Sequence, residues 1–218
     1  MTTVKNQLPP ITSFSRSLPA GRIHQFMRLA GHDPVRAQAL HDWNEAIGSA
    51  LFRPLQKLEL ALRARIPAAF ERIYGPAWYQ GPGFKKKSDL ADRKSIAAAI
   101  QRLMAASLPI DSDAIMAKAP FGLCVGLLRP TYNPNVWSKE LHRTFPALPV
   151  SEGRDGLASI ASHAAWLRNR IDHHEPLVEL DLSLSHSKIL KALSWIDLVL
   201  AARARRDTAV QQLLRAKP

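Results

Sequence analysis

The chain has 218 residues, a formal net charge of +12 and a hydrophobic fraction of 46%. This fraction excludes general disorder, and the length suffices for one compact domain or for a domain with an extension. The single cysteine, Cys124, excludes an internal disulfide and a zinc cluster made of cysteines, and it fits a reducing cytoplasm. No run of about 18 apolar residues and no secretion signal occurs, so we expect no membrane partner and a cytoplasmic location.

The 30 lysine and arginine residues exceed the 18 acidic residues by the full net charge, which indicates an anionic partner. RNA is the first expectation, DNA the second and a membrane surface the third. Plain solubility is the alternative, because net charge alone does not identify a ligand.

Residues 1–12 lack hydrophobic periodicity, so we expect a flexible N-terminal tail there. A single domain is expected over 13–206, followed by a C-terminal tail over 207–218. The first helix of the domain is predicted over 18–30, where three apolar side chains share one face.

A longer helix is predicted from Pro34 to about residue 52, since Asp33 is a suitable N-cap and proline is favoured at the first helical position. Pro54 then either kinks one long helix or begins a second helix, which ends near residue 74. The pattern leaves both alternatives open, and we predict two helices, over 34–52 and 55–74.

Two groups of charged residues in the first half of the chain are candidate contacts. Glu59 and Arg63 are spaced for a helical ion pair. A buried Glu59 would orient a catalytic arginine or histidine, while Arg63 is a candidate RNA phosphate ligand. Lys85, Lys86 and Lys87 follow a glycine-rich loop over 78–88 and form a second phosphate-binding candidate, although a solvated loop explains them equally well.

The middle of the chain is predicted to contain helices over 89–106, 111–118 and 136–145. The apolar segment 120–128 has the composition of a buried strand or a buried helix. We predict a helix there, because the sequence offers no partner strand.

The segment 155–174 is predicted to be a long helix that carries the motif around which the chain is organised. Leu157, Ile160, Ala164, Leu167 and Ile171 are three or four residues apart, which places them on one helical face. Pro176 disfavours helical backbone at the residue before it, so the helix should stop near His174. A final helix is predicted over 183–205.

The last two turns of the helix predicted over 155–174 carry polar side chains suited to phosphate chemistry. Arginine matches a phosphate with a planar fork of donors, and histidine exchanges protons near neutral pH. These are the parts needed for RNA cleavage without a metal. Simple complementation of the helix dipole is the alternative explanation. The candidates are Arg168, Asn169, Arg170, Asp172, His173 and His174.

Residues 168–176 contain the order Arg-Asn-x-x-x-His followed by His-Glu-Pro. This order resembles the signature of the Abi-like proteins, which are bacterial abortive-infection proteins among the HEPN ribonucleases. The resemblance extends from about residue 13 to 195. Its other parts are Asp42-Trp43-Asn44, Leu55-Gln56-Lys57-Leu58-Glu59, Tyr74-Gly75 with Trp78, Pro120-Phe121-Gly122 with Trp137, Phe145-Pro146, and His186 with Ile189 and Trp195-Ile196.

The resemblance implies that Arg168, Asn169 and His173 are catalytic and that His174 is the second histidine of the motif. Asp172 departs from the family pattern, in which this position is usually small. An Arg168–Asp172 pair either keeps the guanidinium away from phosphate or is a resting state that RNA displaces, since such a pair contributes only about 0.5 kcal/mol.

We therefore expect an all-α protein, a HEPN-like helical bundle with additional packed helices, whose long helices cover 34–52, 55–74, 155–174 and 183–205. The resemblance implies a toxin-like, metal-independent endoribonuclease of bacterial antiphage defence. It further implies a homodimer and an antitoxin RNA or protein as a partner. No cofactor and no metal site are expected. The alternative is a HEPN-like module that binds RNA or protein without cleavage.

Overall fold

The computed structural model describes residues 19–218, and all regular structure in this range is helical, which confirms the all-α prediction. The predicted tail over 1–12 lies outside the described residues. No helix within 19–218 combines the length and apolar character needed to cross a lipid bilayer. The elements are α2 (Ala20–Leu29), α3 (Pro34–Tyr74), η1 (Trp78–Gln80), α4 (Pro82–Lys87), α5 (Leu90–Ala105), α6 (Ser112–Lys118), α7 (Phe121–Leu127), η2 (Pro130–Tyr132), η3 (Asn133–Trp137), α8 (Ser138–Thr144), α9 (Gly153–Asp172), α10 (Leu182–Ile196), α11 (Leu198–Arg205) and α12 (Ala209–Arg215).

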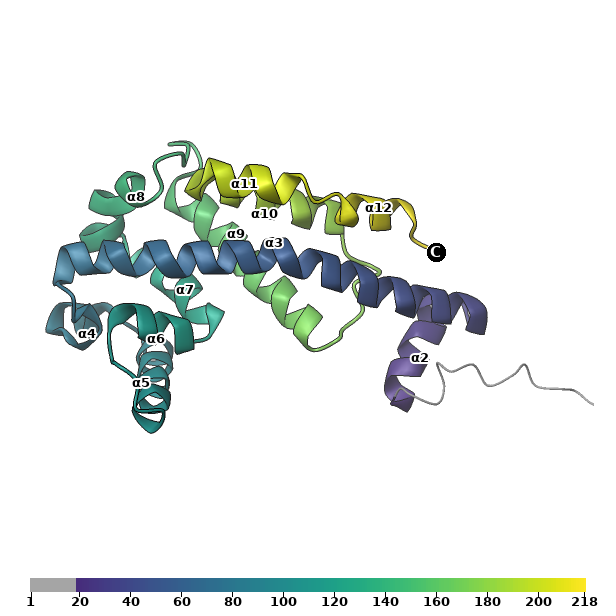
Figure 1. Cartoon of the computed structure of the whole chain (residues 1–218), viewed down its shortest axis with the longest axis horizontal. Coiled ribbons are helices and arrows are strands. Elements are labelled where there is room, and N and C mark those ends of the chain that lie inside the picture. The colour runs from purple at the N-terminus through teal and green to yellow at the C-terminus, as the bar shows by residue number, and fades with distance from the viewer. Residues whose placement is uncertain (1–18) are drawn as a thin grey trace, which may run out of the picture.

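Helix α3 is one continuous helix of 41 residues that runs along most of the molecule (Figure 1). The Asp33 carboxylate caps its start by accepting hydrogen bonds from the Val35 and Arg36 amides at 2.9 and 3.2 Å. Pro54 lies inside this helix, so the prediction of separate helices over 34–52 and 55–74 is wrong. The buried stripe continues through the proline, and this packing offsets the backbone hydrogen bond that Pro54 lacks.

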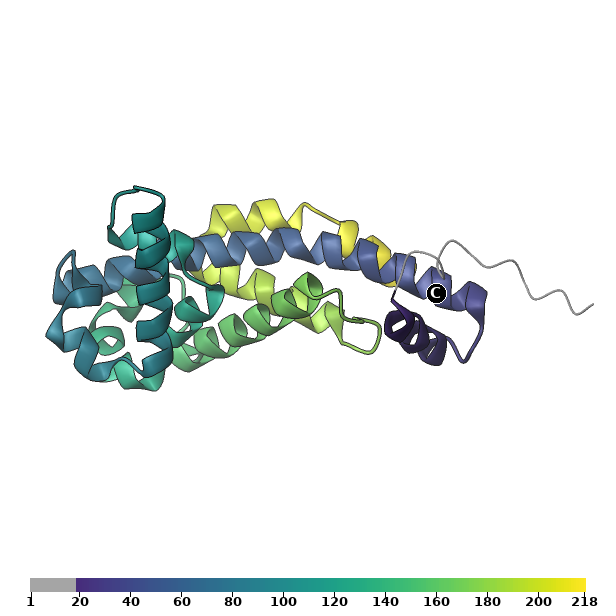
Figure 2. The ribbon, with the colours of Figure 1, turned by 90° about the horizontal axis from the view of Figure 1, so that it is seen from below.

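The other long helices pack around α3. Helices α9, α10, α11 and α12 all contact it, and Figure 2 shows α9 on one side of α3 and α11 with α12 on the other. The predicted core residues Leu157, Ile160, Ala164 and Leu167 of α9 are all buried. The core is therefore a bundle built around α3, with α4 to α8 gathered at the end of α3 that terminates at Tyr74 (Figure 1).

An aromatic cluster joins that end of α3 to the middle of the chain. The ring of Phe70 lies 5.1 Å from Trp78, 5.2 Å from Tyr132 and 5.9 Å from Trp137, measured between ring centroids. Phe84 joins the same cluster at 6.1 Å from Phe70. Fully buried aromatic side chains contribute large apolar areas, so this cluster fixes the position of segments that lack long helices of their own.

Other boundaries refine the predictions. The segment 120–128 contains the predicted buried helix, α7, whereas the predicted loop 78–88 contains η1 and α4. The helix predicted over 183–205 is divided at Asp197, whose carboxylate accepts a hydrogen bond from the Leu200 amide and caps α11. Residues 207–218, described above as a tail, include α12, which packs against α3.

Candidate functional site

Helix α9 ends at Asp172 in a hydrogen-bonded turn that positions both histidines of the motif. The His174 amide bonds to the Ile171 carbonyl at 2.9 Å, and the Glu175 amide bonds to the Arg170 carbonyl at 2.8 Å. This is the Schellman pattern, and His174 occupies its left-handed position with φ 54°. Glycine usually fills that position, so His174 adopts it at a cost of about 1–2 kcal/mol. The helix end agrees with the stop predicted from Pro176.

Three side chains hold the backbone that follows this turn. The Arg22 guanidinium donates to the His173 carbonyl at 3.0 Å, although the two residues are 151 positions apart. Buried Asn44 accepts from the Leu177 amide at 2.6 Å and donates to the Glu175 carbonyl at 3.4 Å. Arg170 donates to the Pro176 carbonyl at 2.9 Å and pairs with the Glu175 carboxylate. The segment from His173 to Leu177 is thus attached to α2, α3 and α9.

Arg168 lies between two carboxylates. Its Nε is 3.0 Å from Glu59 Oε2, and its Nη1 is 2.7 Å from Asp172 Oδ2. The Glu59 side chain is 12% exposed, whereas Asp172 is 37% exposed. Burial reduces solvent screening, so Glu59 is the stronger partner and Asp172 the weaker one. Local spacing predicts the Arg168–Asp172 pair, whereas the sequence suggests for Glu59 only a catalytic arginine or histidine that is not specified further.

Glu59 also holds a second arginine. Arg63 donates to Glu59 Oε1 from Nε at 3.0 Å and from Nη2 at 2.5 Å, and its Nη1 contacts the Met116 carbonyl. The Arg63 side chain is only 14% exposed. These contacts place Arg63 within the packing of α3 against α6, and not on an open RNA-binding surface as predicted.

The remaining polar residues of the motif face solvent. Asn169, Asp172, His173 and His174 are all exposed, and Arg168 is 31% exposed. Within residues 19–218, no hydrogen bond or ion pair joins Arg168 to His173. The structure therefore gathers the motif at one end of α9 without forming a closed catalytic contact in a single chain.

Trp166 lies one turn before Asn169 and Arg170 and is 43% exposed, in contrast to the other four tryptophans, which are buried. The Arg170 guanidinium lies 5.3 Å from the centre of its ring, and the His163 ring lies 5.4 Å away on the preceding turn. An exposed indole beside the motif is a suitable contact for a partner molecule.

The lysines of the predicted phosphate patch lie elsewhere. Lys85, Lys86 and Lys87 form the last turn of α4 and are exposed. Helix α4 follows the end of α3 at Tyr74, whereas Arg168 contacts α3 at Glu59, about 22 Å earlier along the helix axis at 1.5 Å per residue. The patch and the motif are therefore separate surfaces of this chain.

A cleft of about 790 Å³ opens beside the motif, between α2, α3 and the turn after α9. Asp172, His174 and Glu175 line it from the motif side, but Arg168, Asn169 and His173 do not. The second histidine of the motif thus faces the cleft, a difference that the sequence pattern does not indicate. The remaining lining residues are Pro19, Arg22, Phe26, His41, Asn44, Glu45, Gly48, Ser49, Ile171 and Leu177.

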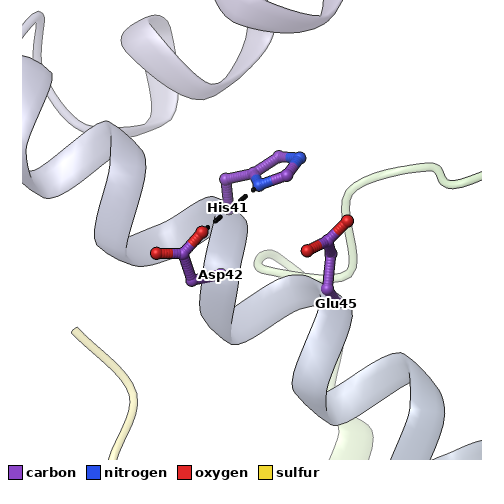
Figure 3. A group of neighbouring side chains, drawn as sticks. All are labelled: His41, Asp42 and Glu45. Carbon is purple, nitrogen blue, oxygen red and sulfur yellow. Dashed lines mark ion pairs between the residues drawn. The ribbon is translucent and has the colours of Figure 1, made fainter. Parts of the chain in front are cut away.

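Two of the α3 residues that line this cleft, His41 and Glu45, form a trio with Asp42. The potential ligand atoms of the three residues lie within 4.8 Å of one another (Figure 3). His41 Nδ1 lies 3.6 Å from Asp42 Oδ1, and the His41 ring packs edge-on against Phe26 at 5.1 Å. None of these three residues is predicted from the sequence to bind a metal. The spacing His-x-x-x-Glu over 41–45, one helical turn, was the signal that could have revealed the trio.

Searches against protein-family models, curated proteins and solved structures found no match to this chain. The resemblance to the Abi-like family is therefore an expectation from the motif residues alone.

Proposed function

We propose that this chain is a metal-independent endoribonuclease of the Abi-like group, acting in the bacterial cytoplasm as a toxin in antiphage defence. The observation that carries the proposal is the exposed turn at the end of α9, where Asn169, His173 and His174 are open to solvent beside a partly exposed Arg168. The net charge of +12 supports a polyanionic substrate.

In the proposed reaction the 2′-oxygen of a ribose forms a bond to the adjacent phosphorus, and the bond from phosphorus to the 5′-oxygen breaks. One proton leaves the 2′-hydroxyl and another is delivered to the 5′-oxygen. His173 moves one of these protons, Asn169 orients the imidazole or a substrate oxygen, and Arg168 stabilises the negative charge on the phosphate.

The contacts of Arg168 assign different roles to its two carboxylates in this proposal. Glu59 is the less exposed partner and holds the Nε side of the guanidinium. Asp172 holds Nη1 in a one-turn pair on a surface helix, and such pairs contribute about 0.3–0.5 kcal/mol. Phosphate, which arginine binds through charge-assisted hydrogen bonds, displaces Asp172 and leaves Glu59 in place.

The proposed active form is a homodimer that brings two copies of the motif together. Within one chain no contact links Arg168 to His173 among residues 19–218, and a second copy would supply the second proton-transferring histidine. The exposed Trp166 beside the motif supports a contact with another copy. Full activity of a strictly monomeric protein would refute the dimer. An antitoxin RNA or protein remains a proposed partner.

The test is an RNA cleavage assay in EDTA with the parent, Arg168→Ala and His173→Ala. Arg205→Ala and His142→Ala are matched controls, because both residues are exposed and lie on other helices. We expect cleavage by the parent and both controls, and loss of cleavage with retained folding and RNA binding in the two motif variants. Cleavage that survives both motif substitutions would refute the site.

A second candidate function has a specific observation in its favour. Arg168 is held by two carboxylates at once, and this arrangement also suits a module that binds RNA or protein without cutting it. Absence of cleavage by the parent at any pH or salt concentration, with RNA binding unchanged in His173→Ala, would favour the binding module. Asp172→Ala then tests whether this carboxylate suppresses activity.

A further inference from the structure

The trio on α3 has the composition and spacing of a metal site. His41 and Glu45 are one turn apart and therefore share a helical face, and Asp42 adjoins them. Their ligand atoms already lie within 4.8 Å of one another, and an ion bonded to three such atoms at about 2.1 Å needs separations of roughly 3–3.5 Å. Glu45 is exposed, so rotation of its side chain can supply this change without movement of the backbone.

The charge around the trio favours a cation. In a chain of net charge +12, neither Asp42 nor Glu45 pairs with a lysine or arginine among residues 19–218. The two carboxylates on the motif side of the cleft are different, because Asp172 pairs with Arg168 and Glu175 with Arg170. The trio consequently contains two carboxylates without a lysine or arginine partner, next to an imidazole.

The surroundings of the trio limit the movement of two of its members. The Gln38 side-chain amide donates to Asp42 Oδ1 at 2.7 Å, and the His41 side chain is 13% exposed and packed against Phe26. Hydrogen bonds to a ligating carboxylate orient it and strengthen metal binding. Since His41 and Glu45 line the cleft, an ion here is reachable from solvent.

We propose that His41, Asp42 and Glu45 bind one divalent transition-metal ion at the edge of the cleft, with the remaining coordination positions open to water or an anionic ligand. One imidazole and two carboxylates suit zinc and related ions, whereas magnesium prefers oxygen ligands alone and near-ideal octahedral geometry. The ion would cross-link successive turns of α3 beside the cleft that His174 also lines. This site is separate from the metal-free cleavage reaction proposed above.

The test uses the full-length chain without an affinity tag, stripped with EDTA and desalted. Zinc is titrated against a chromophoric chelator, and cobalt is followed by its visible absorption. We expect one equivalent bound per chain, a higher melting temperature with zinc, and no displacement of zinc by millimolar magnesium.

Variants separate this site from incidental binding elsewhere. Glu45→Gln and His41→Gln each weaken zinc binding by at least about tenfold, whereas the matched exposed controls Glu179→Gln and His142→Gln leave it unchanged. Glu45 is exposed, so its variant retains the fold if His41→Gln is destabilised. Absence of saturable binding, or equal affinity of Glu45→Gln and the parent, overturns the proposal. Zinc binding by a parent that cleaves no RNA leaves it intact.

Discussion

Glu59 and Asp172 contact the same guanidinium, and the structure predicts very different consequences of removing each. Glu59→Gln retains one acceptor oxygen and places an amide NH₂ group against a guanidinium, so either Arg63 or Arg168 loses its acceptor. The substitution affects the contacts of the Glu59 carboxylate with Arg63 Nε at 3.0 Å, with Arg63 Nη2 at 2.5 Å and with Arg168 Nε at 3.0 Å. Breaking a buried ion pair costs about 3–5 kcal/mol. Because Arg168 is 31% exposed, we reduce the expected loss to about 2–4 kcal/mol.

Asp172→Asn removes a single pair that is one-third exposed on both sides, and its expected cost is about 0.5 kcal/mol. For a chain of this size the two losses correspond to a decrease in melting temperature of roughly 5–15 °C for Glu59→Gln and about 2 °C for Asp172→Asn. Urea denaturation followed by far-UV circular dichroism measures both free energies of unfolding. Glu71→Gln provides the control, since it makes the same change on α3 at a residue without a side-chain ion pair within 19–218.

A double-mutant cycle between Glu59→Gln and Arg168→Gln assigns the loss to this contact, with an expected coupling of about 1 kcal/mol or more. Equal destabilisation by Glu59→Gln and Asp172→Asn would refute the distinction between a permanent partner and a displaceable one. A coupling near zero would show that Glu59 acts through Arg63 alone.

Two further predictions concern the fold. Burial lowers the pKa of His186, which contacts Gln211 of α12 at 3.4 Å, so the unfolded chain binds its proton more readily. The contribution of a neutral His186 to the free energy of unfolding is therefore complete above about pH 6.5 and decreases as the pH falls below that value. The variant His186→Leu should make the free energy of unfolding, measured by urea denaturation, depend less on pH in this range. An unchanged pH dependence would contradict the prediction. On α7, a Cβ added at Gly126 would overlap the buried Asp92 carboxylate, whereas one at Gly122 meets no atom within 4 Å. Gly126→Ala should thus lower the free energy of unfolding by about 1–3 kcal/mol. Gly122→Ala should leave the free energy of unfolding unchanged or raise it by up to about 1 kcal/mol. Similar melting temperatures of the two variants would refute the predicted overlap.

The sequence predicted features that depend on local rules. Asp33 and Pro34 marked the start of α3, and Pro176 marked the end of α9 near His174. The spacing of the apolar residues of α9 identified its buried face. These features follow from backbone sterics and helical periodicity, which act over a few residues.

Other features depend on tertiary packing. Pro54 was compatible with two helices or one, and the continuous buried stripe of α3 decided in favour of one. Helix α12 has only a short apolar pattern and is held by the hydrogen bond from the Trp43 indole to the Leu213 carbonyl at 2.7 Å, across 170 residues. Likewise, the contact between Glu59 and Arg168 could be suggested by residue type but not located by spacing.

The candidate site was predictable to the same degree. Asn169, His173 and the Arg168–Asp172 pair are at one end of α9 because they are close in sequence. The cleft, its His174 side and the anchoring of His173 by Arg22 arise from segments that meet only after folding. The trio on α3 was missed because only one of its members, Asp42, lies in a stretch that the resemblance singles out, Asp42-Trp43-Asn44, and His41 and Glu45 flank that stretch.

The order of the helices along the chain, with α3 before α9, α10 and α12, has a consequence for biosynthesis. The ribosome completes α3 long before it makes α9, α10 and α12, the helices that bury much of its apolar stripe. At ordinary rates of translation that delay is on the order of ten seconds, during which Leu51, Leu55 and Leu58 lack their final cover. Nascent chains that stall before α9 therefore present a long hydrophobic surface, which makes them substrates for chaperones and prone to aggregation.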